Sequence, residues 1–83
     1  MNNQAKLNQV LMQSLSVPET MIDETLSYQS IPEWDSMAHM YLMSGIEEAF
    51  GISLATTDML EMTDLESIRK KLVQHQITFE QEA

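Results

Sequence analysis

An aspartate followed by a serine, Asp35-Ser36, is the residue pair whose types and spacing suggest chemistry most directly. A serine hydroxyl acts as a nucleophile when a histidine and an acid activate it. His39 lies only three residues after Ser36 and His75 lies far along the chain, so neither offers an evident triad. The glycine pattern of a nucleophile elbow is also missing. We therefore expect no catalytic residues and no enzyme. Taken alone, an Asp-Ser pair before a helix is most often an ordinary helix cap.

The elements around this pair are predicted to be helices. Apolar spacing predicts a first helix from about residue 3 to residue 15, and Pro18 prevents its simple continuation. Residues 16–35 form a long connection with a short helical turn expected at residues 23–26. Pro32 predicts an extended chain just before the serine. Apolar side chains are expected to fix this connection to the core, namely Val17, Met21, Ile22, Leu26 and Ile31.

A second helix is predicted from about residue 36 to residue 50, and Gly51 is well placed to end it. One face is assigned to the core, and it holds His39, Leu42, Met43, Ile46, Ala49 and Phe50. The opposite face is unusually apolar for a solvent-exposed surface, and it holds Met37, Tyr41, Ser44 and Glu48, with Met40 near its edge. Gly45 should cost the helix about 1 kcal/mol relative to alanine unless a neighbour packs closely against it.

Two further helices complete the prediction. A short one is expected over residues 57–61, with Thr56 or Thr57 as its cap. The last helix begins with a capping box, Thr63-Asp64-Leu65-Glu66, and its expected buried stripe is Leu65, Ile68, Leu72 and Val73. The pattern predicts an all-α fold, a small four-helix bundle with three longer helices, one short helix and a long first loop. Residues 1–83 are expected to form a single domain.

Two segments of the chain resemble an acyl carrier protein: Trp34-Asp35-Ser36-Met37-Ala38-His39-Met40 and Ile46-Glu47-Glu48-Ala49-Phe50-Gly51-Ile52. In that family the serine of an Asp-Ser-Leu or Asp-Ser-Met motif carries a 4′-phosphopantetheine arm. The resemblance implies that Ser36 holds this arm, which a phosphopantetheinyl transferase takes from coenzyme A, and that acyl groups are carried on its thiol as thioesters. Asp35 is implied as a supporting residue that caps the helix and helps to place a divalent cation during the transfer.

The exposed positions after Ser36 depart from the family, whose members commonly carry acids there. The predicted partner-binding residues are Met37, Met40, Tyr41, Ser44, Glu47 and Glu48. An apolar patch rimmed by acids suits acyl-loading and acyl-processing enzymes with basic or apolar docking surfaces. This favours a specialised pathway that builds a polyketide, a modified fatty acyl group or a surface glycan. An aminoacyl or peptidyl cargo, an unmodified acidic binding module and a small hydrolase that uses Ser36 stay open as alternatives.

The chain holds 13 acids against four lysines and arginines, for a net charge of −9. Such a body repels nucleic acid and anionic membrane, and it is drawn to basic protein surfaces. There are no cysteines, no apolar run reaches the length of a membrane span, and the first six residues lack the apolar core of a signal peptide. We expect a cytoplasmic monomer without membrane insertion. The acids do not form a calcium loop and the two histidines are no zinc signature, so no metal site is expected.

Eight methionines are many for so short a chain. Four of them are expected to line the space between the second, third and fourth helices: Met40, Met43, Met59 and Met62. Because methionine adapts its shape, such a core either is simply filled or opens to shelter part of an acyl chain. We expect simple filling for any single methionine.

Overall fold

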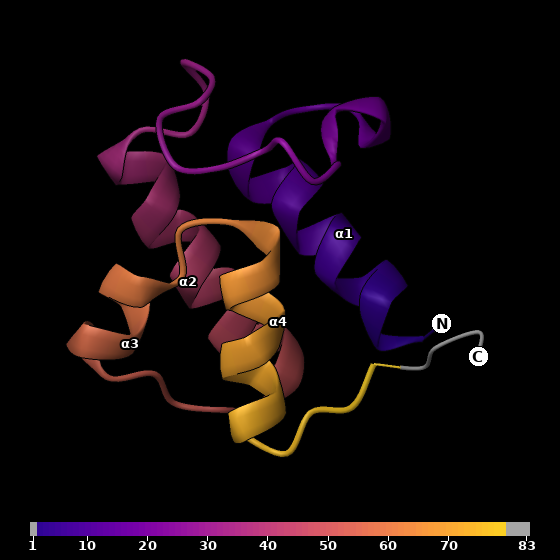
Figure 1. Ribbon diagram of the computed structural model, residues 1–83, viewed down its shortest axis with the longest axis vertical. Helices are drawn as coiled ribbons and strands as arrows, with labels where there is room; N and C mark the ends of the chain where they lie inside the picture. Colours follow the sequence, from indigo (N-terminus) through magenta and orange to yellow (C-terminus); the bar gives the residue numbers. More distant parts are fainter. Residues whose placement is uncertain (1, 80–83) are drawn as a thin grey trace.

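The computed structural model describes residues 2–79 of the chain. This part contains four α-helices and one short 3₁₀ helix (Figure 1). The helices are α1 (Asn3–Leu15), α2 (Ser36–Phe50), α3 (Thr56–Glu61) and α4 (Leu65–Gln74), and the 3₁₀ helix is Glu19–Met21. Within residues 2–79 the β pairing is limited to one isolated antiparallel bridge between Ser27 and Asp64. The predicted all-α class is confirmed.

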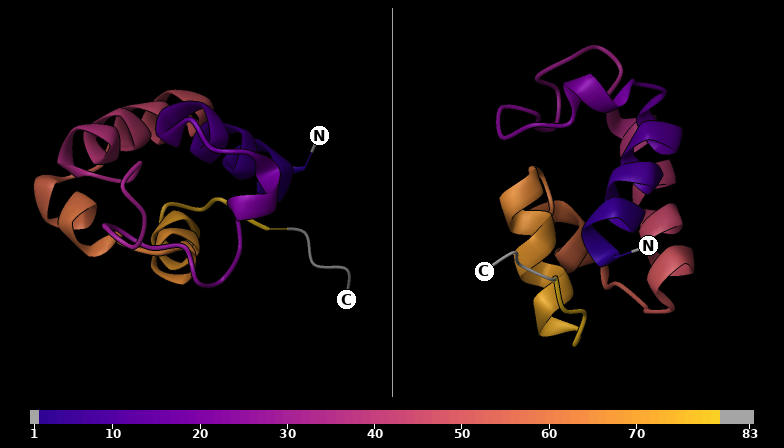
Figure 2. Two further views of the ribbon diagram at one scale, coloured as in Figure 1. Left: turned by 90° about the horizontal axis from the view of Figure 1, so that it is seen from above. Right: turned by 90° about the vertical axis from the view of Figure 1, so that its right-hand side faces the viewer.

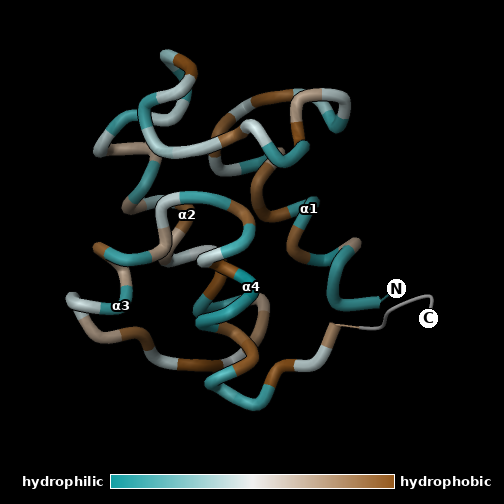
Figure 3. The backbone as a smooth tube through the Cα atoms, viewed as in Figure 1, coloured by the Kyte–Doolittle hydropathy of each residue, from teal (hydrophilic) through white to brown (hydrophobic). Residues whose placement is uncertain are grey.

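The helices surround one apolar core. α1 and α2 lie side by side, and α4 packs across them with α3 beside it (Figures 1 and 2). Along α1, α2 and α4, hydrophobic positions alternate with hydrophilic ones at short intervals (Figure 3), and each of these three helices buries apolar residues. The buried apolar residues are Leu7, Leu11, Leu15, Val17, Leu26, Trp34, Ala38, Leu42, Met43, Ile46, Leu54, Met62, Leu65, Ile68 and Leu72.

The close contact between α1 and α2 depends on Gly45. A β-carbon at this position would lie 3.0 Å from Cγ1 of Val10 and 3.4 Å from Oγ of Ser14. Gly51 has the second special role, because it ends α2 in the left-handed conformation with φ at 65°. The predicted end of α2 is confirmed, and close packing against α1 accounts for the helix-weakening glycine.

The connection between α1 and α2 spans residues 16–35 and runs over one end of the helix pair (Figure 1). Its predicted anchors hold, because Val17 and Leu26 are buried while Met21, Ile22 and Ile31 pack against the core. The expected helical turn at residues 23–26 is wrong in kind. This segment forms an isolated turn with a Leu26 N–H to Asp23 carbonyl bond of 3.1 Å, and the short helix lies earlier, directly after Pro18.

The starts of α3 and α4 differ from prediction by one residue. Ala55 precedes α3, and the Asp58 side chain accepts its N–H at 3.1 Å, so neither threonine caps this helix. Asp64 caps α4: its Oδ1 accepts the Ser67 N–H at 2.8 Å, while the Ser67 hydroxyl oxygen accepts the Asp64 N–H at 3.1 Å. A capping box does begin α4, but it is formed by Asp64 and Ser67.

Val73, which is predicted to face the core, is exposed instead. It is 57% exposed, because it follows the buried Leu72 and the helical rotation of about 100° turns it away from the core. Met40 is predicted both at the edge of the exposed face of α2 and between the helices, and its 56% exposure supports the first placement and contradicts the second. Met43 and Met62 are completely buried, and Met59 packs against the core as predicted. None of the helices in residues 2–79 combines the length and the apolar character that crossing a membrane requires.

Candidate functional site

Ser36 is the first residue of α2, and its side chain is exposed. Asp35 precedes it as the helix cap in an extended conformation, and Oδ1 of Asp35 accepts the Ala38 N–H at 2.9 Å. The Asp35 carbonyl accepts the His39 N–H at 2.9 Å, which closes the first helical turn. No hydrogen bond joins the Ser36 hydroxyl to another of residues 2–79. The hydroxyl therefore stands in solvent on a fixed backbone.

The segment that leads into Ser36 is a turn and not the predicted extended chain. The Trp34 N–H binds the Ile31 carbonyl at 3.2 Å, and the Trp34 carbonyl accepts the Gln29 N–H at 2.9 Å. Pro32 takes the second position of this turn, which suits its fixed φ. At Asp35, directly before Ser36, the chain is extended. Because the Trp34 side chain is completely buried, the backbone enters α2 from an anchored point.

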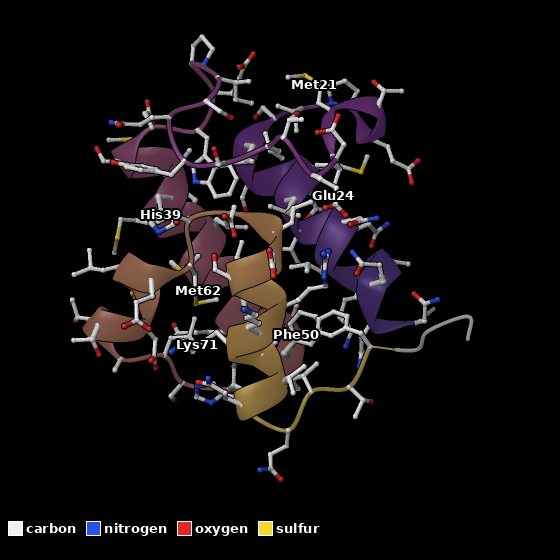
Figure 4. The ribbon with its side chains drawn as sticks, viewed as in Figure 1. Met21, Glu24, His39, Phe50, Met62 and Lys71 are labelled. Atoms are coloured by element: carbon white, nitrogen blue, oxygen red, sulfur yellow. The ribbon has the colours of Figure 1, made fainter. Side chains whose placement is uncertain are left out.

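His39 joins this lead-in to α3. The indole N–H of Trp34 donates to Nδ1 of His39 at 3.0 Å, and Nε2 of His39 lies 2.9 Å from the Met59 carbonyl oxygen. Indole can only donate and a carbonyl can only accept, so the imidazole is neutral and carries its proton on Nε2. His39 is 9% exposed and lies at the junction of α2 and α3 (Figure 4). Both of its ring nitrogens have structural partners other than Ser36.

An apolar surface of three side chains follows Ser36 on α2. Met37 is 66% exposed, Met40 56% and Tyr41 62%, and we call these three residues the α2 apolar surface. Their spacing of three and four residues places them on one side of the helix, and the exposed Ser44 continues that side. Leu60 on α3 is also exposed, at 71%, and the His39–Met59 hydrogen bond holds its helix against α2.

The two acids predicted to rim this surface lie near the end of α2 and have different surroundings. Glu47 is half-buried, and its Oε2 accepts the Leu54 N–H at 2.7 Å, so it fixes the loop between α2 and α3. Glu48 is exposed. Both remain predicted partner-binding residues, but Glu47 also has a structural role that the sequence did not reveal.

An open hollow borders the N-terminal end of α2, where Ser36 lies. Ser14 and Ser16 line it from the end of α1, and Met37, Ala38 and Tyr41 line it from α2. Its walls combine hydroxyl groups and apolar side chains with the carboxylates of Glu33 and Asp35. Asp35 and Met37 are the two sequence neighbours of Ser36, so the hollow lies next to the serine.

The charged side chains gather instead between α3 and α4. Nζ of Lys71 lies 2.9 Å from Oε1 of Glu61 and 3.1 Å from Oδ1 of Asp58, and these acids raise the pKa of Lys71. Lys71, with the Ala55 N–H, lowers the pKa of Asp58 from its ordinary value. Nε2 of His75 also lies 3.7 Å from Oδ2 of Asp58. This cluster joins α3 to α4. It also gives His75 a partner in Asp58, while His39 is bound to Trp34 and Met59.

Two parts of this arrangement escaped the sequence analysis. The Trp34–His39–Met59 chain of hydrogen bonds joins a turn and two helices, and no periodic pattern signals a contact of that kind. Leu60 lies in a helix of six residues, which is too short to show which side faces the core.

Among residues 2–79, no three histidine, cysteine or acidic side chains lie close enough together to hold a metal ion.

Comparisons of the chain with protein-family models, with curated proteins and with solved structures found no match, so the function has to be inferred from the chain's own residues.

Proposed function

We propose that this protein is an acyl carrier protein that bears a 4′-phosphopantetheine arm on Ser36 and holds acyl groups on it as thioesters. The observation that carries the proposal is the setting of Ser36 in a motif of the Asp-Ser-Met type. Its hydroxyl is exposed in the first turn of α2, behind the Asp35 cap and the buried Trp34. A carrier needs a serine that a transferase can reach but whose backbone does not move.

The residues around Ser36 fit the modified state. A phosphodiester on its hydroxyl would bring negative charge to the start of a 15-residue helix. The amides and the dipole at this end favour an anion by about 0.3–1 kcal/mol when exposed. The hollow bordered by Ser14, Ser16 and Tyr41 gives the uncharged part of an attached chain polar and apolar surface to lie against, and the carboxylates of Glu33 and Asp35 also border it. The arm supplies a thiol, and the protein supplies its position.

The occupied histidines favour an attachment point over a hydrolase. A serine nucleophile needs a base within about 2.6–3.2 Å of its hydroxyl. His39 uses both ring nitrogens on Trp34 and Met59, and His75 lies beside Asp58. A transferred arm needs no such base, because the transferase supplies the catalytic groups.

The partners follow from the surface after Ser36. We assign the docking of three kinds of enzyme to the α2 apolar surface: the transferase, acyl-loading enzymes and acyl-processing enzymes. The proposed docking site also includes Ser44, Glu47, Glu48 and Leu60. Exposed apolar side chains beside a reactive group are typical of a protein-binding site. The net charge of −9 attracts basic surfaces around the contact. We further propose the four-helix bundle of a stand-alone, monomeric, cytoplasmic carrier in a specialised biosynthetic pathway.

The α2 apolar surface also favours a second candidate function. An unmodified protein-binding module would use the same exposed Met37, Met40 and Tyr41 without any arm. The two functions differ in one property, which is covalent modification of Ser36.

The test is intact mass after incubation with coenzyme A, magnesium and a broad-specificity phosphopantetheinyl transferase. Wild type is compared with Ser36→Ala and with Ser53→Ala, which removes another exposed hydroxyl in the loop after α2. We expect one arm on wild type and on Ser53→Ala, and none on Ser36→Ala. An arm on Ser36→Ala would exclude Ser36 as the site. A folded wild type that gains no arm, while a known carrier in the same tube does, would support the binding module.

A further inference from the structure

The methionines of α2 divide sharply by exposure. Met43 is completely buried, as is Met62 before α4, whereas Met37 and Met40 are 66% and 56% exposed. The two exposed thioethers lie one and four residues after Ser36, and their spacing of three puts them on the same side of the helix. α2 thus presents two exposed methionine side chains beside the candidate attachment site and keeps a third one buried.

An accessible thioether reacts with hydrogen peroxide by a balanced two-electron step. The methionine sulfur gains one peroxide oxygen and is oxidised to the sulfoxide, while the peroxide is reduced and leaves as water. Methionine sulfoxide reductases reverse the change with two thiols, which become a disulfide as the oxygen leaves as water. Since reaction requires contact with the oxidant, Met37 and Met40 should react before Met43 and Met62.

We propose that Met37 and Met40 form a reversible oxidation site that controls whether partner enzymes reach Ser36. The inference rests on the proposed carrier function and adds a means of regulation to the same site. Met37, Met40 and Tyr41 carry no charge, so a partner that docks on this part of the surface gains binding free energy there from apolar contact. A sulfoxide replaces that apolar surface with a strongly polar, hydrated group.

The fold tolerates this modification. Neither Met37 nor Met40 belongs to the buried core, and α2 is held by Leu42, Met43 and Ile46 on its other side. Oxidation therefore changes the recognition surface and leaves the helix in place. A sulfoxide at Met43 or Met62 would instead put a polar group into the core and destabilise the protein.

The experiment compares wild type with the double variant Met37→Leu, Met40→Leu, which keeps apolar side chains but removes the reactive sulfur atoms. Each protein is treated with hydrogen peroxide, the peroxide is removed, and the rate of arm transfer to Ser36 is followed by intact mass. Peptide mapping reports which methionines are oxidised, and circular dichroism reports the helix content. A portion of oxidised wild type is returned with methionine sulfoxide reductases and a dithiol before the assay.

We expect Met37 and Met40 to be oxidised before Met43 and Met62, and the transfer rate of wild type to fall about tenfold, as when an interface loses an anchor. Reductase treatment should restore it. The leucine variant, whatever its own starting rate, should load at the same rate with and without peroxide treatment. An unchanged rate for wild type oxidised at both positions would overturn the proposal. So would an equal loss in the leucine variant. Untreated wild type that takes no arm would overturn the carrier function itself, a different result.

Discussion

The first half of α2 and the junction of α3 with α4 differ in the chemistry of their exposed side chains. After Ser36 the exposed side chains are apolar, and the hydrogen bonds of the region lie underneath them, between Trp34, His39 and Met59. At the α3–α4 junction the side chains are charged, and Lys71 contacts both Asp58 and Glu61.

This difference in side-chain chemistry distinguishes residues that stabilise the fold from residues that the fold does not need for stability. The ion pairs at Lys71 join two helices, so their removal should appear in stability. Met37, Met40 and Tyr41 join nothing within residues 2–79 that the core requires, so their removal should appear in function. Exposed apolar area with no structural task is what a binding surface needs.

The largest difference in unfolding free energy is expected between variants of Leu42 and Tyr41, which are adjacent on α2. Leu42→Ala empties a completely buried site and should lower the free energy of unfolding by about 2–5 kcal/mol. Tyr41→Ala removes a larger but exposed side chain and should change it by less than about 0.5 kcal/mol, while slowing arm transfer. Urea denaturation and intact mass measure the two properties. A large loss of unfolding free energy in Tyr41→Ala would contradict the claim that the exposed side chains of α2 are not needed for stability.

A smaller loss is expected when the hydrogen bonds beneath the apolar surface are removed. His39→Leu leaves the Trp34 indole N–H without its acceptor and the Met59 carbonyl without its donor. Leaving a buried polar group unpaired costs about 1–3 kcal/mol. Met40→Leu, one residue along, is the matched control and should be close to neutral. Equal unfolding midpoints in urea for His39→Leu and wild type would show that the hydrogen bonds do not join α2 to α3.

The smallest effect should be a change in acid sensitivity at the α3–α4 junction. Lys71 and the Ala55 N–H hold the pKa of Asp58 below its ordinary 3.8 in the folded protein. The stabilisation from this carboxylate is therefore present above that value and is lost as the pH falls through the lower folded pKa. Asp58→Asn should flatten the fall of unfolding free energy in this acid range, whereas Glu48→Gln on α2 should not. The measurement is urea denaturation at several pH values from 5 downward, and parallel curves for wild type and Asp58→Asn would contradict the assignment.

How far the sequence predicted the molecule depends on whether a feature is local. The bounds of α1 and α2 were predicted correctly, because apolar periodicity, Pro18 and Gly51 define them within a few residues. The cap of α4 was misplaced by one residue because Thr63 with Glu66 and Asp64 with Ser67 fit almost the same pattern. Similarly, Pro32 permits both an extended chain and a turn, and the hydrogen bonds around Trp34 select the turn.

The candidate site was predictable in its position but not in its support. Ser36 at the start of α2 and the exposed Met37 and Tyr41 follow from the helical period. The bond of His39 to Met59 joins residues 20 positions apart, and its chemistry depends on a packing arrangement that no local pattern contains. The same holds for Glu47, which looks like a surface acid in the sequence and binds the Leu54 amide in the structure.

The most direct test of the carrier function is the state of Ser36 in the cells that make this protein. The protein is isolated from those cells without added transferase, and the peptide containing Ser36 is analysed by mass spectrometry. We predict that this peptide carries a 4′-phosphopantetheine arm in a phosphodiester bond on Ser36, with or without an acyl group on the thiol. A folded protein whose Ser36 peptide is found only unmodified would contradict the account.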